Sequence, residues 1–352
     1  FGYWDQVSHA REQYRESIRN GFNGAEVSVP LQQLVLAASK WLDKVTAGIE
    51  RAKEIGDGLI PTYFAFKADQ WEKLTDEKGK EKLNKKGLPL VKVYSFEVSA
   101  LPHFLEGPAR EMKTASLETA QTIYKNVRES DIFDAKLKMY KTSGSLEEET
   151  YEIGRARAFT PGWLERESIF MHMEFKYLLS VLKSGLYEEF FEDLTNALPP
   201  FMDPEVYGRS ILENSSFIAS SANPDESLHG QGFVARLSGT TAEFLSIWQL
   251  MMIGKEVFTV NEAGLSLRLQ PILPSWLFDA DGKLQFTLLG HTEVTYQNPS
   301  GKHTYGADDV RTVKYVLHMD GEMVEVNNES LPESYAKDVR DGKITKMDVY
   351  LN

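Results

Sequence analysis

Residues 227–252 read SLHGQGFVARLSGTTAEFLSIWQLMM, a glycine-punctuated polar turn that runs directly into a strongly apolar helix. Thr240 and Glu243 match a capping box, which predicts that this helix begins at Thr240. The first N–H groups of a helix lack intrahelical acceptors, so such a turn can bind an anion. Gly239 would let the backbone approach that anion closely. The alternative is an ordinary capped helix that packs into the core.

The composition narrows the classes of protein that the chain can belong to. Its 352 residues suffice for two or more domains, and 42% hydrophobic residues exclude a disordered chain. A net charge of −13 disfavours a nucleic-acid partner. The absence of cysteine fits a reducing compartment, and no apolar run is long enough to span a membrane. We therefore expect a cytoplasmic protein with neither a nucleic-acid nor a membrane partner.

The periodicity of apolar residues predicts helices first and strands later. Steps of three and four between residues 30 and 55 indicate an amphipathic helix, and the helical period returns at 111–127, 169–183 and 187–194. A strand is predicted at 90–100, and the charged run 76–87 predicts a solvated loop or hairpin tip. Short β-prone runs follow at 266–269, 284–289, 293–297, 312–319 and 323–326. The chain is thus predicted to be mainly α with a C-terminal β-domain.

Other side chains could contribute to a site. His172 lies on an apolar helix, where it is either a core histidine or an anion ligand. Glu165 and Glu167 flank Arg166 close to Phe159, and carboxylates beside aromatic rings suit sugar binding. An exposed charge cluster is the alternative. No HExxH motif, His/Cys cluster, P-loop or GxSxG elbow is present, so neither a metal site nor a cofactor is expected.

Four blocks occur in a specific order: TPGWLERESIFMH at 160–172, YGRSILENSS at 207–216, LSGTT at 237–241 and GLSLRLQPILPSW at 264–276. In this order they resemble the inverting glycoside phosphorylases of the cellobiose, chitobiose and cellodextrin phosphorylase family. That family has an Asn-Pro-Gly block ending in Ile-Phe-x-His, a Thr-Gly-(Ala/Ser)-Ala turn and a proline-rich approach to its β-domain. The block at 207–216 looks most like the 1,2-β-oligoglucan phosphorylase branch.

The resemblance implies a fold and an activity. Residues 1–262 would form the later helices of an (α/α)6 barrel, and residues 263–352 an antiparallel, jelly-roll-like β-sandwich. The chain would be the C-terminal part of a longer polypeptide whose upstream part completes the barrel, and it could form a homodimer. The implied reaction is phosphorolysis of a β-gluco-oligosaccharide with inversion, which releases α-glucose 1-phosphate, together with its reverse. Inorganic phosphate would be a co-substrate, and no cofactor would be needed.

The resemblance also assigns residues to the two substrates. His172, Ser238 and Gly239 would bind phosphate, with Ser238 standing where the family usually has threonine. Phe159 falls where cellobiose phosphorylases carry an aromatic residue that contacts the sugar, and Glu165 falls on a glutamate near the acceptor. Because phosphate is itself a nucleophilic anion, such an enzyme needs a general acid but no base to activate water.

The general acid is the point at which the chain departs from the family. The family's Gly-Asp-Trp-Asn-Asp motif aligns with residues 2–6, GYWDQ, so that Tyr3 stands in the position of the acid. Asp5 is the nearest carboxylate and is therefore the predicted catalytic acid. The departure leaves a non-catalytic carbohydrate-binding or scaffold protein as an alternative. An inverting glycoside hydrolase that uses water is a further alternative.

Overall fold

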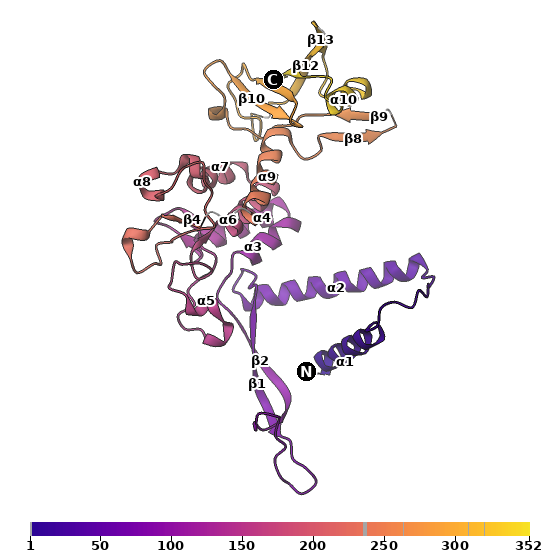
Figure 1. The fold of residues 1–352 in the computed structure, drawn as a ribbon, viewed down its shortest axis with the longest axis vertical. Helices are drawn as coiled ribbons and strands as arrows, with labels where there is room; N and C mark the ends of the chain where they lie inside the picture. Colours follow the sequence, from indigo (N-terminus) through magenta and orange to yellow (C-terminus); the bar gives the residue numbers. More distant parts are fainter. Residues whose placement is uncertain (1, 235–237, 263, 309, 320) are drawn as a thin grey trace. The chain divides into compact units, whose positions relative to one another are not determined.

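The computed structural model describes residues 2–234, 238–262, 264–308, 310–319 and 321–352 (Figure 1). The chain divides into two compact units, Phe1–Gly107 and Pro108–Asn352. Among the described residues, no helix combines the length and the apolar character needed to cross a membrane.

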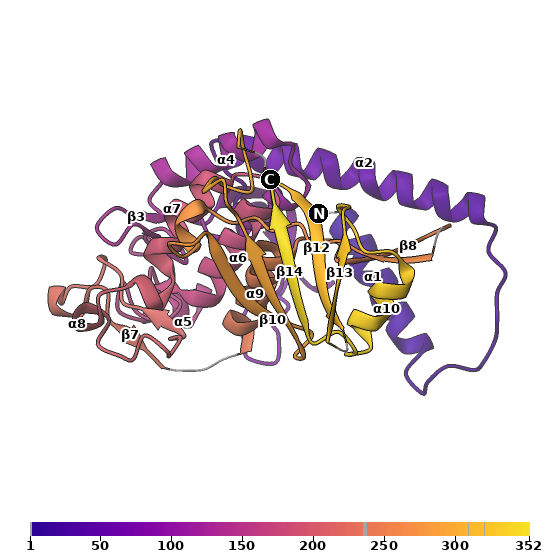
Figure 2. The ribbon, with the colours of Figure 1, turned by 90° about the horizontal axis from the view of Figure 1, so that it is seen from above.

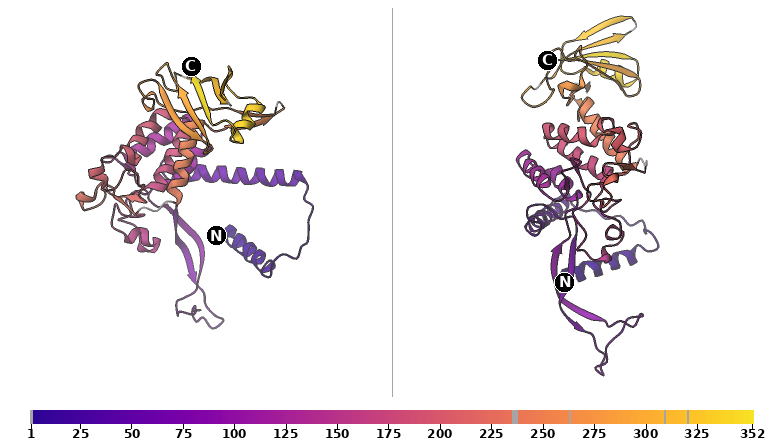
Figure 3. Two further views of the ribbon diagram at one scale, coloured as in Figure 1. Left: turned by 45° about the horizontal axis from the view of Figure 1, so that its top comes forward. Right: turned by 90° about the vertical axis from the view of Figure 1, so that its left-hand side faces the viewer.

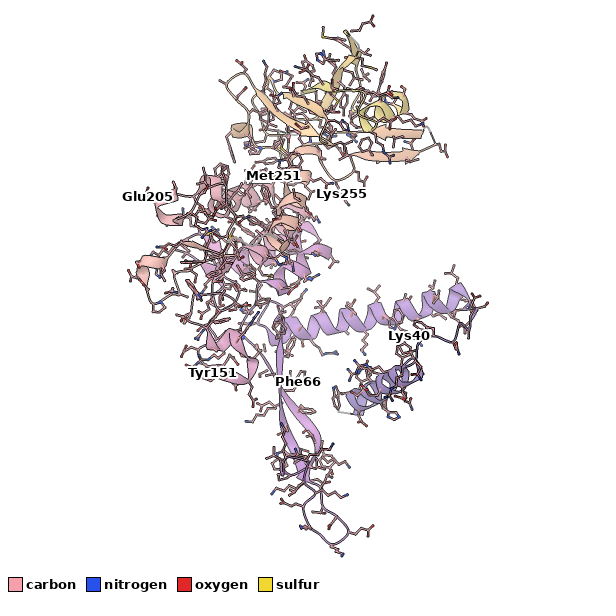
Figure 4. All side chains as sticks on the ribbon, in the orientation of Figure 1. Lys40, Phe66, Tyr151, Glu205, Met251 and Lys255 are labelled. Carbon is pink, nitrogen blue, oxygen red and sulfur yellow. The ribbon has the colours of Figure 1, made fainter. Side chains whose placement is uncertain are left out.

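The first unit consists of two helices and a long hairpin. The helices are α1 (Gly2–Ser17) and α2 (Leu31–Ile55), and the hairpin pairs β1 (Phe64–Lys73) with β2 (Val91–Ala100). The helix predicted from residue 30 and the strand predicted from residue 90 are confirmed. Neither helix has a buried residue, and the hairpin is a two-stranded ribbon in both views of Figure 3. Lys40 and Phe66, labelled in Figure 4, are exposed on α2 and on β1.

The second unit begins with a group of helices around α6 (Met171–Lys183), of whose 13 residues ten are buried. The rings of Phe175 on α6 and Phe244 on α9 lie 5.9 Å apart, which shows that these two helices pack together. The other helices of this part are α3 (Glu106–Glu111), α4 (Leu117–Glu129), α5 (Arg155–Ala158), α7 (Tyr187–Ala197), α8 (Pro204–Tyr207) and α9 (Ser238–Ile253). Short strands pair β3 (Phe133–Asp134) with β4 (Met139–Tyr140), and β6 (Phe217–Ile218) with both β5 (Ile169–Phe170) and β7 (Gly232–Phe233).

The start of α9 differs from the local prediction, and its end agrees with it. The helix begins at Ser238, two residues before the predicted start, so Thr240 lies within its first turn and is buried. Its last helical residue is Ile253, and Gly254 follows with a φ of 84°, a backbone conformation that glycine adopts without strain. The predicted end near Gly254 is therefore confirmed.

A five-stranded sheet forms the C-terminal part of the second unit (Figure 2). Its order is β10 (Lys283–Leu288), β11 (Thr292–Gln297), β14 (Lys346–Leu351), β12 (Thr312–Met319) and β13 (Glu322–Val326), with β14 parallel to β11 and antiparallel to β12. A separate hairpin pairs β8 (Phe258–Asn261) with β9 (Gly264–Leu267). The core contains Val349 from the sheet, Ala336 and Val339 from α10 (Glu333–Arg340), and Met252 and Ile253 from the end of α9.

The predicted (α/α)6 barrel followed by a β-sandwich is wrong. Such a barrel needs regular helix pairs in two concentric rings, whereas the ten α-helices of the described residues range from 4 to 25 residues. A sandwich needs two facing sheets. Here one mixed sheet packs against α10, the β8–β9 hairpin and the end of α9. The domain boundary predicted between residues 262 and 263 stays a prediction.

Candidate functional site

Two helices of the second unit, α6 and α9, begin side by side. The strand β5 leads directly into α6, and the N–H of Met171 donates to the carbonyl of Ser216, 3.0 Å away. His172 is the second residue of α6, and Gly239 is the second residue of α9. A Cβ on Gly239 would lie 2.5 Å from Nδ1 of His172, so the imidazole packs directly on the glycine backbone. Only glycine leaves room for the ring in this position.

A cavity of about 400 Å³ opens at these two helix starts. It collects residues from five parts of the chain: the loop around α5, the β5–β6 pair, the residue after β7, the start of α6 and the start of α9. Its lining residues are Arg155, Phe159, Leu164, Glu165, Phe170, His172, Ser216, Phe217, Val234, Gly239 and Thr240. Four residues predicted for phosphate or sugar, Phe159, Glu165, His172 and Gly239, thus line one cavity.

His172 is not the core histidine that the sequence left as an alternative. Its side chain is 37% exposed and faces the cavity. Its Nε2 lies 3.7 Å from Oε1 of Glu243, so a proton on that nitrogen is within ion-pair distance of a carboxylate. The first N–H groups of α6 and α9 add further donors at this end of the helices, where the helix dipole is positive. The arrangement favours an anionic ligand.

The segment between α5 and β5 is held by a buried arginine. Arg166 donates to the carbonyl of Arg157 at 2.8 Å and to the carbonyl of Phe159 at 2.9 Å, and it also forms an ion pair with Glu147. Burial raises the pKa of the Glu167 carboxyl. The exposed charge cluster considered from the sequence is therefore wrong for Arg166 and Glu167. Arg166 fixes the backbone that carries Phe159 into the cavity wall.

The half-buried Glu165 and several aromatic rings form a part of the cavity wall that suits a sugar. Arg155 donates to Glu165, which orients this carboxylate at the cavity edge. Phe159 and Phe170 line the wall together with Phe217, against which Trp163 packs at a centroid distance of 4.9 Å. Aromatic rings beside an oriented carboxylate can hold the apolar face and the hydroxyls of a sugar. A cavity of this size falls within the range of small-molecule sites.

Two of the predicted site residues are not among those that the structure brings together. Ser238 is the first residue of α9, but its side chain lies outside the described residues. Asp5 is an exposed residue in the first turn of α1, in the first unit, and does not line the cavity. Tyr3, which stands in the position of the family's acid, is contacted by the ammonium of Lys44, 3.8 Å from its ring centroid.

The sequence interpretation missed several cavity residues. Arg155 lies ten residues before its partner Glu165, and the pair becomes visible only when the intervening loop folds back. Phe217 reaches the site through pairing of β6 with β5, and Phe170 is its register partner. The β-prone Phe217-Ile218 dipeptide was a signal, but a long irregular loop surrounds it.

A buried polar network joins Glu174 of α6 and Asp193 of α7 through Tyr140 of β4. Asp193 accepts hydrogen bonds from Tyr140 at 2.6 Å, Tyr124 at 3.1 Å and Arg128 at 3.0 Å, and burial raises its pKa to about 6. Glu174 accepts from the N–H of Tyr140 at 3.0 Å, while its Oε1 has no partner among the described residues. Burial raises the pKa of Glu174 well above its ordinary value.

Comparison of the chain with known proteins gave no match. No protein-family model matches the chain, and a search of curated proteins found no match. Within the part of the chain that the structure describes, no group of three or more His, Asp or Glu side chains could hold a metal ion. The chemistry of the site is therefore inferred from the residues that line the cavity.

Proposed function

We propose that the cavity at the start of α6 and α9 binds inorganic phosphate beside a β-linked gluco-oligosaccharide. The reaction is phosphorolysis with inversion, which releases α-glucose 1-phosphate, and its reverse, and the protein acts in the cytoplasm. The observation that carries the proposal is that four residues assigned to the two substrates line one cavity: Phe159, Glu165, His172 and Gly239.

Phosphate is held at the helix starts. The N-terminal ends of α6 and α9 each supply about half a positive charge and several N–H donors. His172 donates from its ring, whose Nε2 lies 3.7 Å from Oε1 of Glu243. Gly239 has no side chain, so the ring and the anion both reach the backbone of α9. Donors fixed before the anion arrives need no reorganisation during the reaction.

The sugar lies against the aromatic wall, with Phe159 on its apolar face and Glu165 accepting hydrogen bonds from its hydroxyls. A phosphate oxygen attacks the anomeric carbon from the face opposite the glycosidic oxygen, and the bond to that oxygen breaks. The leaving oxygen takes a proton from a general acid, and it is the sequence resemblance, not the lining of the cavity, that names Asp5 for this role. A β-glucoside therefore gives an α-linked sugar 1-phosphate.

Incubation of the protein with β-gluco-oligosaccharides of several linkages tests this proposal, with and without phosphate. We expect α-glucose 1-phosphate only when phosphate is present. Asp5→Asn should lower the rate, whereas Asp43→Asn, an exposed control on α2 of the same unit, should not. An intact fold that yields no sugar phosphate from any linkage contradicts the proposal.

The same experiment separates the two alternatives. Release of free glucose at a rate independent of phosphate indicates an inverting hydrolase. Tyr3 in the position of the acid, with the Lys44 ammonium at its ring, is the observation that favours a non-catalytic carbohydrate-binding protein. That alternative predicts oligosaccharide binding without turnover, and an Asp5→Asn variant that binds as tightly as the wild type.

A further inference from the structure

The end of the β1–β2 hairpin, residues 82–92, combines positive charge with apolar side chains and is called the hairpin tip below. Its sequence, KLNKKGLPLVK, has four lysines and no acidic residue, a net charge of +4 in a chain whose net charge is −13. All of these residues are exposed, including Leu83, Leu88 and Leu90. Large apolar side chains that gather on a surface mark a site of interaction, unlike scattered ones. The hairpin tip therefore has the character of a binding surface.

Hydrogen bonds hold the hairpin tip in a defined shape. The N–H of Leu90 donates to the carbonyl of Lys82 at 2.7 Å. Oδ1 of Asn84 accepts from the N–H groups of Lys86 at 2.8 Å and Leu88 at 3.0 Å, which fixes the turn between them. The lysines and leucines thus project from an ordered backbone. A partner that binds them need not first order a loose chain.

The second unit carries a surface of opposite charge around α8. Residues 201–226 contain five acidic residues and Arg209, a net charge of −4. The exposed acidic and large apolar side chains of this α8 surface are Asp203, Glu205, Glu213, Asp225, Glu226, Phe201, Val206, Ile211 and Leu212. Leu212 is 90% exposed, and Glu205 is labelled in Figure 4. Arg209 pairs with Glu213 at 2.9 Å, so the net charge belongs to the other four carboxylates.

Buried contacts hold the α8 surface in shape from beneath. The hydroxyl of Tyr207, a buried residue of α8, donates to the carbonyl of Glu213 at 2.7 Å. A Cβ on Gly230 would lie 2.7 Å from Cγ1 of Val206, so the turn that follows η4 (Glu226–Leu228) packs against α8. The acidic residues before and after this loop therefore belong to one ordered surface.

We propose that the hairpin tip of one copy of the chain binds the α8 surface of a second copy. The two surfaces match in charge, +4 against −4, and each presents four large exposed apolar side chains. Lysine stems can cover apolar area while their ammonium groups pair with carboxylates. Because every copy has both surfaces, a two-fold dimer makes the same contact twice.

Size-exclusion chromatography with light scattering tests the proposal on the full 352-residue chain. We expect the wild type to have about twice the 39.9 kDa mass of one copy. The tip variant reverses three exposed lysines: Lys82→Glu, Lys85→Glu, Lys86→Glu. The α8 variant reverses three exposed glutamates: Glu205→Lys, Glu213→Lys, Glu226→Lys. Each should raise the dimer dissociation constant about 100-fold, because like charges then face each other.

A control and a mixture separate this contact from a general effect of charge. The control variant reverses three exposed lysines outside both surfaces: Lys40→Glu, Lys67→Glu, Lys125→Glu. Its dissociation constant should stay within about twofold of the wild type. The tip variant and the α8 variant should dimerise with each other when mixed, because each then meets the opposite charge at both contacts.

Four results would overturn the proposal. They are a wild type with the mass of one copy, a tip or α8 variant that dimerises as tightly as the wild type, a control variant that loses the dimer, and a mixture that stays monomeric. Far-UV circular dichroism of each variant checks that the fold is intact. The readout is the mass of the particle, so the result does not depend on the reaction proposed for the cavity.

Discussion

Two cavities of the second unit, of about 400 Å³ and about 860 Å³, lie at opposite ends of α6 and α9 and differ in the residues that line them. The smaller one, at the N-terminal ends of α6 and α9, has one histidine and an arginine that is already paired with Glu165. The larger one, at the C-terminal ends, is lined by five basic side chains. The smaller cavity lies at two helix starts with fixed backbone N–H groups, whereas three exposed lysines are among the residues that line the larger one.

This difference teaches which of the two cavities suits one small anion. The proposed site for one small anion combines fixed N–H groups with a histidine packed on Gly239. The lysines that line the larger cavity are exposed, and no contact fixes their ammonium groups in one geometry among the described residues.

Removal of the histidine should have the largest effect. We expect His172→Ala to lower the phosphate-dependent rate by about 100- to 1,000-fold, as for the loss of one fixed donor to a reacting anion. The comparison is sharpened by His291→Ala, which alters a histidine of the sheet region that lines neither cavity. Equal rates for both variants would show that the helix starts do not hold the phosphate.

Addition of one methyl group at the helix start should have the next largest effect. The Cβ of Gly239→Ala would lie 2.5 Å from the imidazole, so His172 must move. We expect phosphate affinity to fall by about 10- to 100-fold, because a displacement of about 1 Å has effects of that order. Gly48→Ala is the matched control, since a Cβ there meets nothing within 4 Å. A Gly239→Ala protein with unchanged affinity would contradict the close packing.

The buried carboxyl that supports α6 should respond to pH. Burial raises the pKa of Glu174 in the folded protein above its value of 4.5 in the unfolded chain. The contribution of Glu174 to the free energy of unfolding is therefore complete below pH 4.5 and is lost as pH rises through the pKa of the folded protein. We expect Glu174→Gln to raise the free energy of unfolding at pH 7 by about 1–3 kcal/mol and to change it little at pH 4. Urea denaturation at both pH values measures this.

Asp193 should also lower the free energy of unfolding as pH rises. Its pKa rises from 3.8 in the unfolded chain to about 6, so stability should fall as pH increases between these values. Glu205→Gln, on the exposed surface of α8, is the control and should show no such pH dependence. A stabilisation by Glu174→Gln that is the same at pH 4 and pH 7 would rule out the buried charge as its cause.

Salt should have the smallest effect on phosphate binding at the smaller cavity. The Debye length falls from about 10 Å at 0.1 M salt to about 3 Å at 1 M, which screens exposed lysines more than fixed backbone donors. Over that range we expect orthophosphate affinity to fall by less than about threefold. A tenfold or larger fall would show that exposed side chains, not fixed backbone donors, hold the phosphate.

Local periodicity predicted much of the secondary structure because it reports which residues are apolar. The helix from Leu31, the strand from Val91 and the end of α9 before Gly254 were all predicted. The same pattern does not report which surface each apolar face contacts. The mixed sheet, for example, requires β14 to pass between β11 and β12, a long-range pairing that no local signal encodes. The barrel and the sandwich were wrong for this reason.

The two cavities show the same limit. The proximity of His172 and Gly239 was predicted because two blocks in a specific order resembled one family. No comparable sequence pattern predicted the larger cavity, because its basic residues are spread from Lys113 to Arg311 and share no motif. Arg166 was considered only as part of a charge cluster, although its burial and its bonds to two carbonyls place it at the centre of the loop.

The most direct test of the smaller cavity follows the imidazole nitrogens of the seven histidines by ¹⁵N NMR while orthophosphate is added. The account predicts that the His172 resonances shift more than those of any other histidine. It also predicts that Gly239→Ala abolishes that shift. A His172 signal that does not respond to phosphate, in a folded protein, would contradict the assignment of phosphate to the starts of α6 and α9.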